Sequence, residues 1–429
     1  MKGFMFLIIG IPLIVNAQRG GIQFEKEIGW QQVIDMAKAE HKYIFVDCFA
    51  TWCAPCREME KNIYTLNSVG NYFNGKFISV KIQMDTSRQD NKEVISWYPD
   101  ARKIMSEYNV TSLPTFLFFS ESGKIVHRDF GYKEENEFLN LGINATNDNK
   151  QYYTLLEKYK YGIKDYSVLD YLANTAENLG DTSIANLVAA DYTNNYLIHL
   201  MDSELYKENN IKFIRTFIHS SNERGFVFFY SNGNKINGIM RDTTYSQIVI
   251  ERIILKEEIN PLLVKLIKLH SNHKPDWKRL SLIIEKKFNA YFADRTILEA
   301  KIFWYSFKRE WTEYTKNLVK KVDRYGVSAQ SRDFLLNNCA WEVFLHSNNA
   351  NELERALFWS NMAIKVADKS NIPNWMDTNA NIRYKLGMVD EAIAIEKRII
   401  SFNSEDQNVK NFSNNLTKMI RGEPTWANN

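Results

Sequence analysis

The chain has 429 residues, well beyond the roughly 150 residues of an average domain, so we expect two or three domains. Hydrophobic residues make up 45% and charged residues 24%, a balance that excludes a disordered chain. The 54 basic and 51 acidic side chains leave a net charge of +3, too weak a field to favour nucleic acid as a partner.

The N-terminus has the pattern of a signal peptide. Lys2 precedes an apolar run over 4–15, and the small residue Ala17 follows it. The run is shorter than the roughly 20 residues that a membrane-spanning helix needs, and no later stretch is apolar enough to span. We therefore predict cleavage after Ala17, a signal peptide over 1–17, and a soluble mature chain that is periplasmic or secreted. An uncleaved anchor is the alternative.

The next part of the chain predicts an α/β domain over residues 18–145. Apolar residues at helical spacing and short runs rich in Val, Ile and Phe define its elements. In chain order we expect a helix over 29–40, a strand over 43–49, a helix over 55–67, a strand over 77–82, a polar stretch to 100, a helix over 101–108, and strands over 113–119 and 124–128 joined by a turn. Alternating helices and strands with a closing hairpin predict a mixed sheet flanked by helices.

From about residue 146 the composition changes to long stretches rich in Leu, Ile, Ala, Tyr and Lys, with few prolines. We predict a helical region over 146–325. Its aromatic segment 225–238 fits a strand or a helix by pattern, and the surroundings favour a helix.

The C-terminal part carries a weak internal repeat. Ala356 and Ala363 stand about 36 residues before Ala392 and Ile399, and Gly387 ends the helix that precedes the second pair. This spacing is close to the tetratricopeptide period of 34 residues. We predict tetratricopeptide-like helical repeats over 326–429.

Four cysteines occur in the chain: Cys48, Cys53, Cys56 and Cys339. That number excludes a scaffold held together by disulfides. A bridge between Cys53 and Cys56 would close so short a loop that it would remove little entropy from the unfolded chain, so this pair points to redox chemistry. We interpret Cys48 as a small buried hydrophobe and Cys339 as inert.

A cysteine pair between a buried strand and a helix has a defined chemistry. Cys53 precedes the helix, where free amides and the helix dipole stabilise a thiolate, so it is the expected nucleophile. Cys56 lies one turn later and can resolve the mixed disulfide. Asp47 ends the apolar strand, where burial would raise its pKa toward that of a proton acceptor, and Lys81 on the neighbouring strand could pair with it.

These residues resemble the thioredoxin family. The resemblance covers about residues 22–142 and rests on the following residues: Val46-Asp47, Trp52-Cys53-Ala54-Pro55-Cys56, Lys81, Asp85, Leu113-Pro114-Thr115 and Gly131. It implies a thioredoxin-like fold in which Pro114 is a cis-proline that presents the backbone of Leu113 to an extended substrate and keeps metal from the thiolates. Trp52 would lie against the site. The segment 58–60 is closer to the C-terminal domain of the membrane thiol:disulfide interchange protein.

The chain also departs from the family pattern. Nearly twice the usual number of residues separates Asp85 from Pro114, so 86–100 is expected to be an insertion near the site. Three alternatives remain at this stage: a zinc site, which would lack a second ligand pair; a solvated Asp47; and a trans Pro114 in an ordinary turn.

The sequence thus predicts an exported thiol-disulfide oxidoreductase that uses no metal and no cofactor. Its partners would be exported proteins that carry thiols or disulfides, together with a membrane electron donor if it works as a reductant. The resemblance favours reduction or isomerisation. The alternative is a binding or scaffold protein, in which the helical repeats hold a protein partner and the thioredoxin-like domain is accessory.

Overall fold

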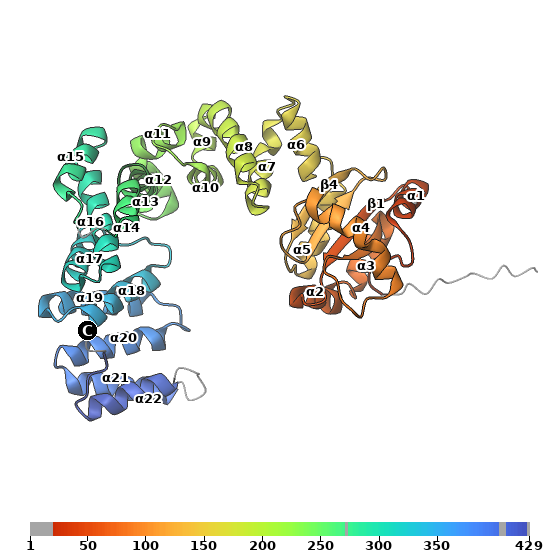
Figure 1. Cartoon of the computed structure of the whole chain (residues 1–429). Coiled ribbons are helices and arrows are strands. Elements are labelled where there is room, and N and C mark those ends of the chain that lie inside the picture. The colour runs from red at the N-terminus through yellow and green to blue at the C-terminus, as the bar shows by residue number, and fades with distance from the viewer. Residues whose placement is uncertain (1–19, 271–272, 403–408, 427–429) are drawn as a thin grey trace, which may run out of the picture. The chain divides into compact units, whose positions relative to one another are not determined.

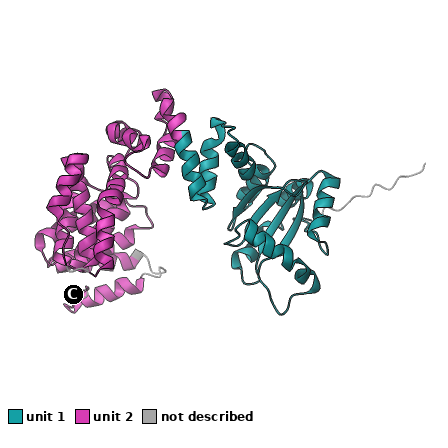
Figure 2. Cartoon of the chain, turned by 45° about the horizontal axis from the view of Figure 1, so that its top comes forward, with its two compact units in different colours: residues 1–192 teal, residues 193–429 magenta. Residues whose placement is uncertain are grey.

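A computed structural model describes residues 20–270, 273–402 and 409–426 (Figure 1). The signal peptide predicted over 1–17 lies outside the described residues. The chain divides into two compact units, 1–192 and 193–429 (Figure 2). The domain borders expected near 145 and 325 stay predictions.

The first unit is built on a four-stranded mixed sheet of order β2-β1-β3-β4. Its strands are β1 (Tyr43–Phe49), β2 (Phe77–Gln83), β3 (Thr115–Phe119) and β4 (Ile125–Phe130). β1 is parallel to β2 and antiparallel to β3, and β4 closes the hairpin with β3. This confirms the predicted α/β class. β3 begins at Thr115, two residues later than predicted, since Pro114 has no N–H to donate to a ladder.

Alternating side chains of β1 supply both faces of the sheet. Ile44 and Val46 pack with residues of α1 (Trp30–Glu40) and α4 (Lys92–Glu107). Phe45 lies on the opposite face in an aromatic cluster with α3 (Asn67–Lys76) and α5 (Glu135–Ala145). Asp47 is two residues after Phe45, so its side chain points to that same face.

Two helices differ from the prediction. The helix expected over 55–67 is α2 (Ala54–Glu58) continued by a π-helical turn, η1 (Met59–Ile63), and the separate helix α3 follows. The stretch 86–100, expected to be a polar insertion, contains the first half of α4, which begins at Lys92. Asn91 caps α4 by accepting a hydrogen bond from the amide of Val94 at 2.9 Å, and Trp97 anchors the helix in the core. Pro99 lies inside the helix.

The rest of the described chain is helical, as predicted. The helices are α6 (Tyr152–Lys160), α7 (Tyr166–Asn178), α8 (Thr182–Asn195), η2 (Leu197–His199), α9 (Asp202–Leu205), α10 (Glu208–Phe217), α11 (Arg224–Ser231), α12 (Gly233–Met240), α13 (Tyr245–Ile254), η3 (Leu255–Ile259), α14 (Asn260–Lys268), α15 (Trp277–Lys287), α16 (Ala290–Phe307), α17 (Trp311–Tyr325), α18 (Arg332–His346), α19 (Ala350–Val366), α20 (Ile372–Lys385), α21 (Val389–Phe402) and α22 (Val409–Ile420). The segment 225–238 is helical, as favoured. Successive helices pack on one another, α18 on α19 and α20 on α21. The tetratricopeptide-like interpretation stays a prediction. Within the described ranges, none of the helices combines the length and the apolar character needed to cross a bilayer.

The first helices after the sheet pack on its edge strand β4. The amide of Tyr152 donates to Nδ1 of His127 at 3.0 Å, and burial lowers the pKa of His127 to about 4, so the ring stays neutral and accepts. The guanidinium of Arg128 donates to both oxygens of Asp181 at 3.0 Å. The Tyr152 hydroxyl donates to the same carboxylate at 2.6 Å. These bonds join α6 and α8 to the sheet within the first unit.

Candidate active site

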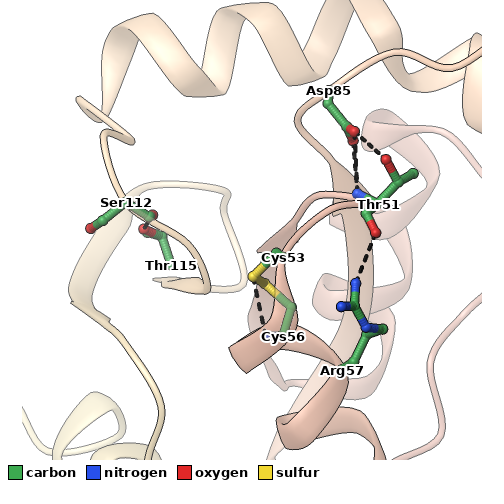
Figure 3. The surroundings of a disulfide bond; sticks show 7 residues. All are labelled: Thr51, Cys53, Cys56, Arg57, Asp85, Ser112 and Thr115. Atoms are coloured by element: carbon green, nitrogen blue, oxygen red, sulfur yellow. Dashed lines mark hydrogen bonds between the residues drawn. A yellow bond between two sulfur atoms is a disulfide. The ribbon is translucent and has the colours of Figure 1, made fainter.

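The cysteine pair lies at the N-terminus of α2, directly after β1. Cys53 and Cys56 form a disulfide with their Cα atoms 5.3 Å apart (Figure 3). Cys53 is the N-cap residue of α2, and its sulfur accepts a hydrogen bond from the amide of Cys56 at 3.1 Å. An amide at a helix N-terminus stabilises negative charge. The same contact would therefore stabilise a Cys53 thiolate after reduction.

Both sulfurs of the disulfide are shielded. Cys53 is 1% exposed and Cys56 is 6% exposed, and the side chains of Phe49 and Leu113 pack against them. Trp52, in contrast, is 70% exposed. The expectation that Trp52 lies against the site stays a prediction.

Hydrogen bonds among Thr51, Asp85 and Arg57 hold the loop between β1 and α2, and the sequence pattern had assigned no role to these residues. The amide of Thr51 donates to both Asp85 oxygens, at 3.1 and 3.2 Å, and the Thr51 hydroxyl donates to the same carboxylate. Nη1 of Arg57 donates to the Thr51 carbonyl at 3.0 Å (Figure 3). Thr51 and Asp85 follow the carboxyl ends of the parallel strands β1 and β2. The sequence could have indicated this contact, because the carboxyl ends of neighbouring parallel strands meet at one edge of a sheet.

Asp47 is buried in the sheet before the cysteine loop, with only 1% of its surface exposed. Burial raises its pKa to about 7, while the Lys81 charge and the Tyr64 hydroxyl oppose the rise. The solvated alternative for Asp47 is therefore wrong. A carboxyl with a pKa near neutrality can both accept and return a proton at physiological pH.

Lys81 faces Asp47 in the β1–β2 register, as the sequence suggested. Its Nζ makes an ion pair with Oε1 of Glu60 at 3.0 Å and lies 4.7 Å from the centroid of the Phe49 ring. Glu60 belongs to the π-helical turn that continues α2, and it had been noted only as part of the family resemblance. Lys81 is thus shared between two carboxylates instead of being a dedicated partner of Asp47.

The loop that carries Pro114 lies against the cysteine pair. The Leu113–Pro114 peptide bond is cis, which excludes the trans alternative. The Pro114 carbonyl accepts a hydrogen bond from the amide of Gly131 at 2.8 Å, and the Thr115 hydroxyl donates to the Ser112 carbonyl at 2.6 Å. These bonds fix the backbone on both sides of Leu113.

The two other cysteines lie outside this site. Cys48 is fully buried in the core on the opposite face of β1, and burial followed by the Asp47 charge raises its pKa well above that of a free thiol. Burial raises the pKa of Cys339 to about 11. Both thiols are therefore protonated at neutral pH. Within the described ranges, no cluster of three or more His, Cys, Asp or Glu side chains could hold a metal ion.

Comparison with known proteins assigns the first third of the chain. A family described as thioredoxin-like domain matches residues 30–145. Thioredoxin H2 of Arabidopsis thaliana is 31% identical over 114 residues, which are 27% of this chain and 71% of that protein. The chain belongs to the thioredoxin family. Its thioredoxin-like domain carries the cysteine pair, and the match leaves the long helical region without a counterpart in Thioredoxin H2.

Two further similarities involve proteins named for disulfide chemistry. The thiol:disulfide interchange protein DsbD of Actinobacillus pleuropneumoniae serotype 5b is 29% identical to the thioredoxin-like domain over 127 residues, 28% of this chain. The chain spans only 20% of the length of DsbD. A solution structure from Bacteroides thetaiotaomicron, named as a disulphide-isomerase, is 32% identical and covers 30% of this chain and 97% of its own, with a TM-score of 0.25.

Proposed function

We propose that this protein is an exported thiol-disulfide oxidoreductase that reduces or isomerises disulfides of exported proteins. The observation that carries the proposal is the Cys53–Cys56 disulfide at a helix N-terminus, with the buried Asp47 on the strand that leads to it. The site combines a stabilised nucleophile, a resolving thiol and a proton acceptor of suitable pKa.

The reaction begins with the reduced pair. The Cys53 thiolate attacks one sulfur of a substrate disulfide, the substrate S–S bond breaks, and a mixed disulfide forms while one substrate thiolate leaves and takes up a proton. Cys56 then gives its proton to Asp47 and attacks the Cys53 sulfur. The mixed disulfide breaks, the second substrate thiolate leaves, and the enzyme disulfide forms. Two electrons pass from the enzyme to the substrate.

The other predicted site residues position the substrate and tune the proton acceptor. Leu113 and Pro114 would present an extended backbone to the substrate segment beside the disulfide, and the exposed Trp52 would contact that segment. Lys81 would limit the rise in the Asp47 pKa through its positive charge. None of these roles requires a metal or a cofactor.

The prediction that the protein is exported rests on the N-terminal sequence pattern and on the similarity to DsbD. An exported reductant must be recharged after each turnover, and a membrane electron donor would supply the two electrons. The observation behind the alternative, a scaffold with an accessory redox domain, is the long series of helices among the described residues after 151. If that reading were right, the cysteine pair would be dispensable for the protein's action.

The decisive experiment is reduction of insulin disulfides by dithiothreitol in the presence of the full mature chain. We expect acceleration with the unaltered chain and with Cys339→Ser, and none with Cys53→Ser. The Cys56→Ser variant should accumulate mixed disulfides with exported proteins, because the resolving thiol is missing. Equal rates with Cys53→Ser and the unaltered chain would refute the enzymatic proposal.

A further inference from the structure

The helical region contains a cavity of about 600 Å³ far from the cysteine pair in sequence. α10 contributes Lys212, Arg215 and Thr216 to its walls. Arg241, which ends α12, and Tyr245, which begins α13, complete the wall together with the segment 329–330. All of these residues belong to the second compact unit. The cavity thus brings three cationic side chains together.

Arg215 is held in place without a counter-ion. Its guanidinium carbon lies 4.4 Å from the centroid of the Tyr245 ring, and Tyr245 is 6% exposed. Stacking fixes the plane of a guanidinium and leaves its N–H edge available. Neither Arg215 nor Arg241 pairs with a carboxylate in the part of the chain that the structure describes. A further guanidinium lies close by: Arg252 donates to the Arg215 carbonyl at 3.1 Å, and burial and then the charge of Arg215 lower its pKa.

The two acidic residues at the cavity offset part of this charge, but neither of them forms an ion pair with Arg215 or Arg241 among the described residues. Glu208 pairs with Lys212 at 3.3 Å, but both side chains are more than half exposed, so water and salt weaken the pair. Asp242 is 4% exposed, and its carboxylate accepts hydrogen bonds from the Thr244 amide and hydroxyl at 2.8 Å and from the Ser328 hydroxyl at 2.5 Å. Asp242 therefore anchors the cavity wall and is not available to Arg215 or Arg241.

We propose that this cavity binds an anionic ligand that carries at least two acidic groups, one held by Arg215 and one by Arg241. The guanidinium fork matches the two oxygens of a carboxylate or a phosphate, and both guanidinia are free to pair. The volume lies in the range of about 300–1,000 Å³ that is usual for small-molecule sites.

Side chains, and not the backbone amides of a helix N-terminus, would bind the anionic ligand in this cavity. The N-terminus of α13 faces Asp242, which already accepts the hydrogen bond of the Thr244 amide, so it is not open to a phosphate. Two sources could provide the paired acidic groups: an acidic peptide segment of a protein partner, or a small phosphorylated or polycarboxylic compound. Both sources present paired acidic groups, and titration with a peptide and with a phosphate compound distinguishes them.

The test is calorimetric titration of the full mature chain in 50 mM salt with two probes, a tetraglutamate peptide and inorganic pyrophosphate. We expect at least one probe to bind at a single site, with tetraglutamate preferred if the source is a peptide and pyrophosphate if it is a phosphorylated compound. The double variant R215Q/R241Q should bind at least tenfold more weakly. The control R279Q/R421Q removes the same charge from two exposed arginines and should bind as the unaltered chain does.

Two results would overturn the proposal. One is the absence of binding by both probes, and the other is an equal loss in the two double variants, which would mean that only net charge matters. Circular dichroism of both variants shows whether the fold is kept. The titration uses no redox reaction, so it is independent of insulin reduction, and the two proposals can fail separately.

Discussion

Asp47 and Lys81 face each other on the parallel strands β1 and β2, yet the ion pair of Lys81, at 3.0 Å, is made with Glu60. The buried carboxyl is therefore only partly compensated, and burial dominates its pKa of about 7. Burial destabilises the charged form of Asp47 in the folded chain, and this cost has measurable consequences for stability and for rate.

The first prediction concerns the stability of Asp47→Asn. Burial raises the pKa of Asp47 to about 7 in the folded chain, whereas the ordinary pKa of this side chain, which applies to the unfolded chain, is 3.8, so the folded state binds more protons between these limits. Stability therefore falls as pH rises from about 4 to about 7 and is constant above. Asparagine cannot ionise, so the variant should be more stable at pH 8 by on the order of 3 kcal/mol and equal at pH 3. Urea unfolding of the oxidised chain measures this, with the exposed Asp148→Asn as control.

The second prediction concerns the rate of the same variant. Without a proton acceptor for Cys56, the second step of the exchange slows, and we expect insulin reduction at pH 7 to fall by about tenfold. Alkylation of Cys53 by iodoacetamide should change little, because its helix N-terminus is intact. A normal rate with Asp47→Asn would show that another group takes the proton.

The third prediction addresses the bonds between Asp85 and Thr51. Asp85→Ala removes the acceptor of the Thr51 amide and hydroxyl, so the loop before Cys53 loses its anchor. We expect kcat/KM for insulin reduction to fall by about five- to tenfold, which corresponds to about 1–1.4 kcal/mol. Asp85→Asn keeps one acceptor oxygen and should retain more activity than Asp85→Ala. If Asp85→Ala and Asp85→Asn both left kcat/KM nearly unchanged, the bonds between Asp85 and Thr51 would have no part in catalysis.

The fourth prediction concerns the cover over the disulfide. Leu113 packs against Cys53, which is 1% exposed. Leu113→Ala should open a path to the sulfur and speed reduction of the oxidised chain by the small reagent dithiothreitol by about threefold or more, since access limits thiol-disulfide exchange. Stopped-flow fluorescence follows the reaction, and Trp52→Ala, at the 70% exposed neighbour of Cys53, is the control. An unchanged rate would mean that Leu113 does not control access.

The elements and site residues that local sequence patterns determine were predicted, and those that depend on tertiary contacts were missed. The strands over 43–49 and 77–82, the helix N-terminus at Cys53 and the burial of Asp47 follow from alternation and spacing, which one chain segment carries by itself. The first half of α4 was missed because its residues are mostly polar. Burial of Trp97 and Ala101 holds this helix on the core although Pro99 lies within it. The role of Glu60 depends on the π-helical turn after α2, which leaves no pattern in the sequence.

The last prediction concerns a buried acid in the second unit. Glu396 is fully buried, and its carboxyl lies beside that of Asp377. Burial and then the nearby Asp377 raise its pKa to about 10. The folded chain therefore keeps a proton that the unfolded chain releases above a pH of about 4.5, and stability falls as pH rises toward 10. Glu396→Gln should raise the Tm at pH 8 by about 5 °C, or about 2 kcal/mol, and leave it unchanged near pH 4.5. Calorimetry at both pH values measures the Tm, with a glutamine substitution at the exposed Glu354 as control. Equal increases in Tm at the two pH values would show that packing, and not ionisation, causes the gain in stability.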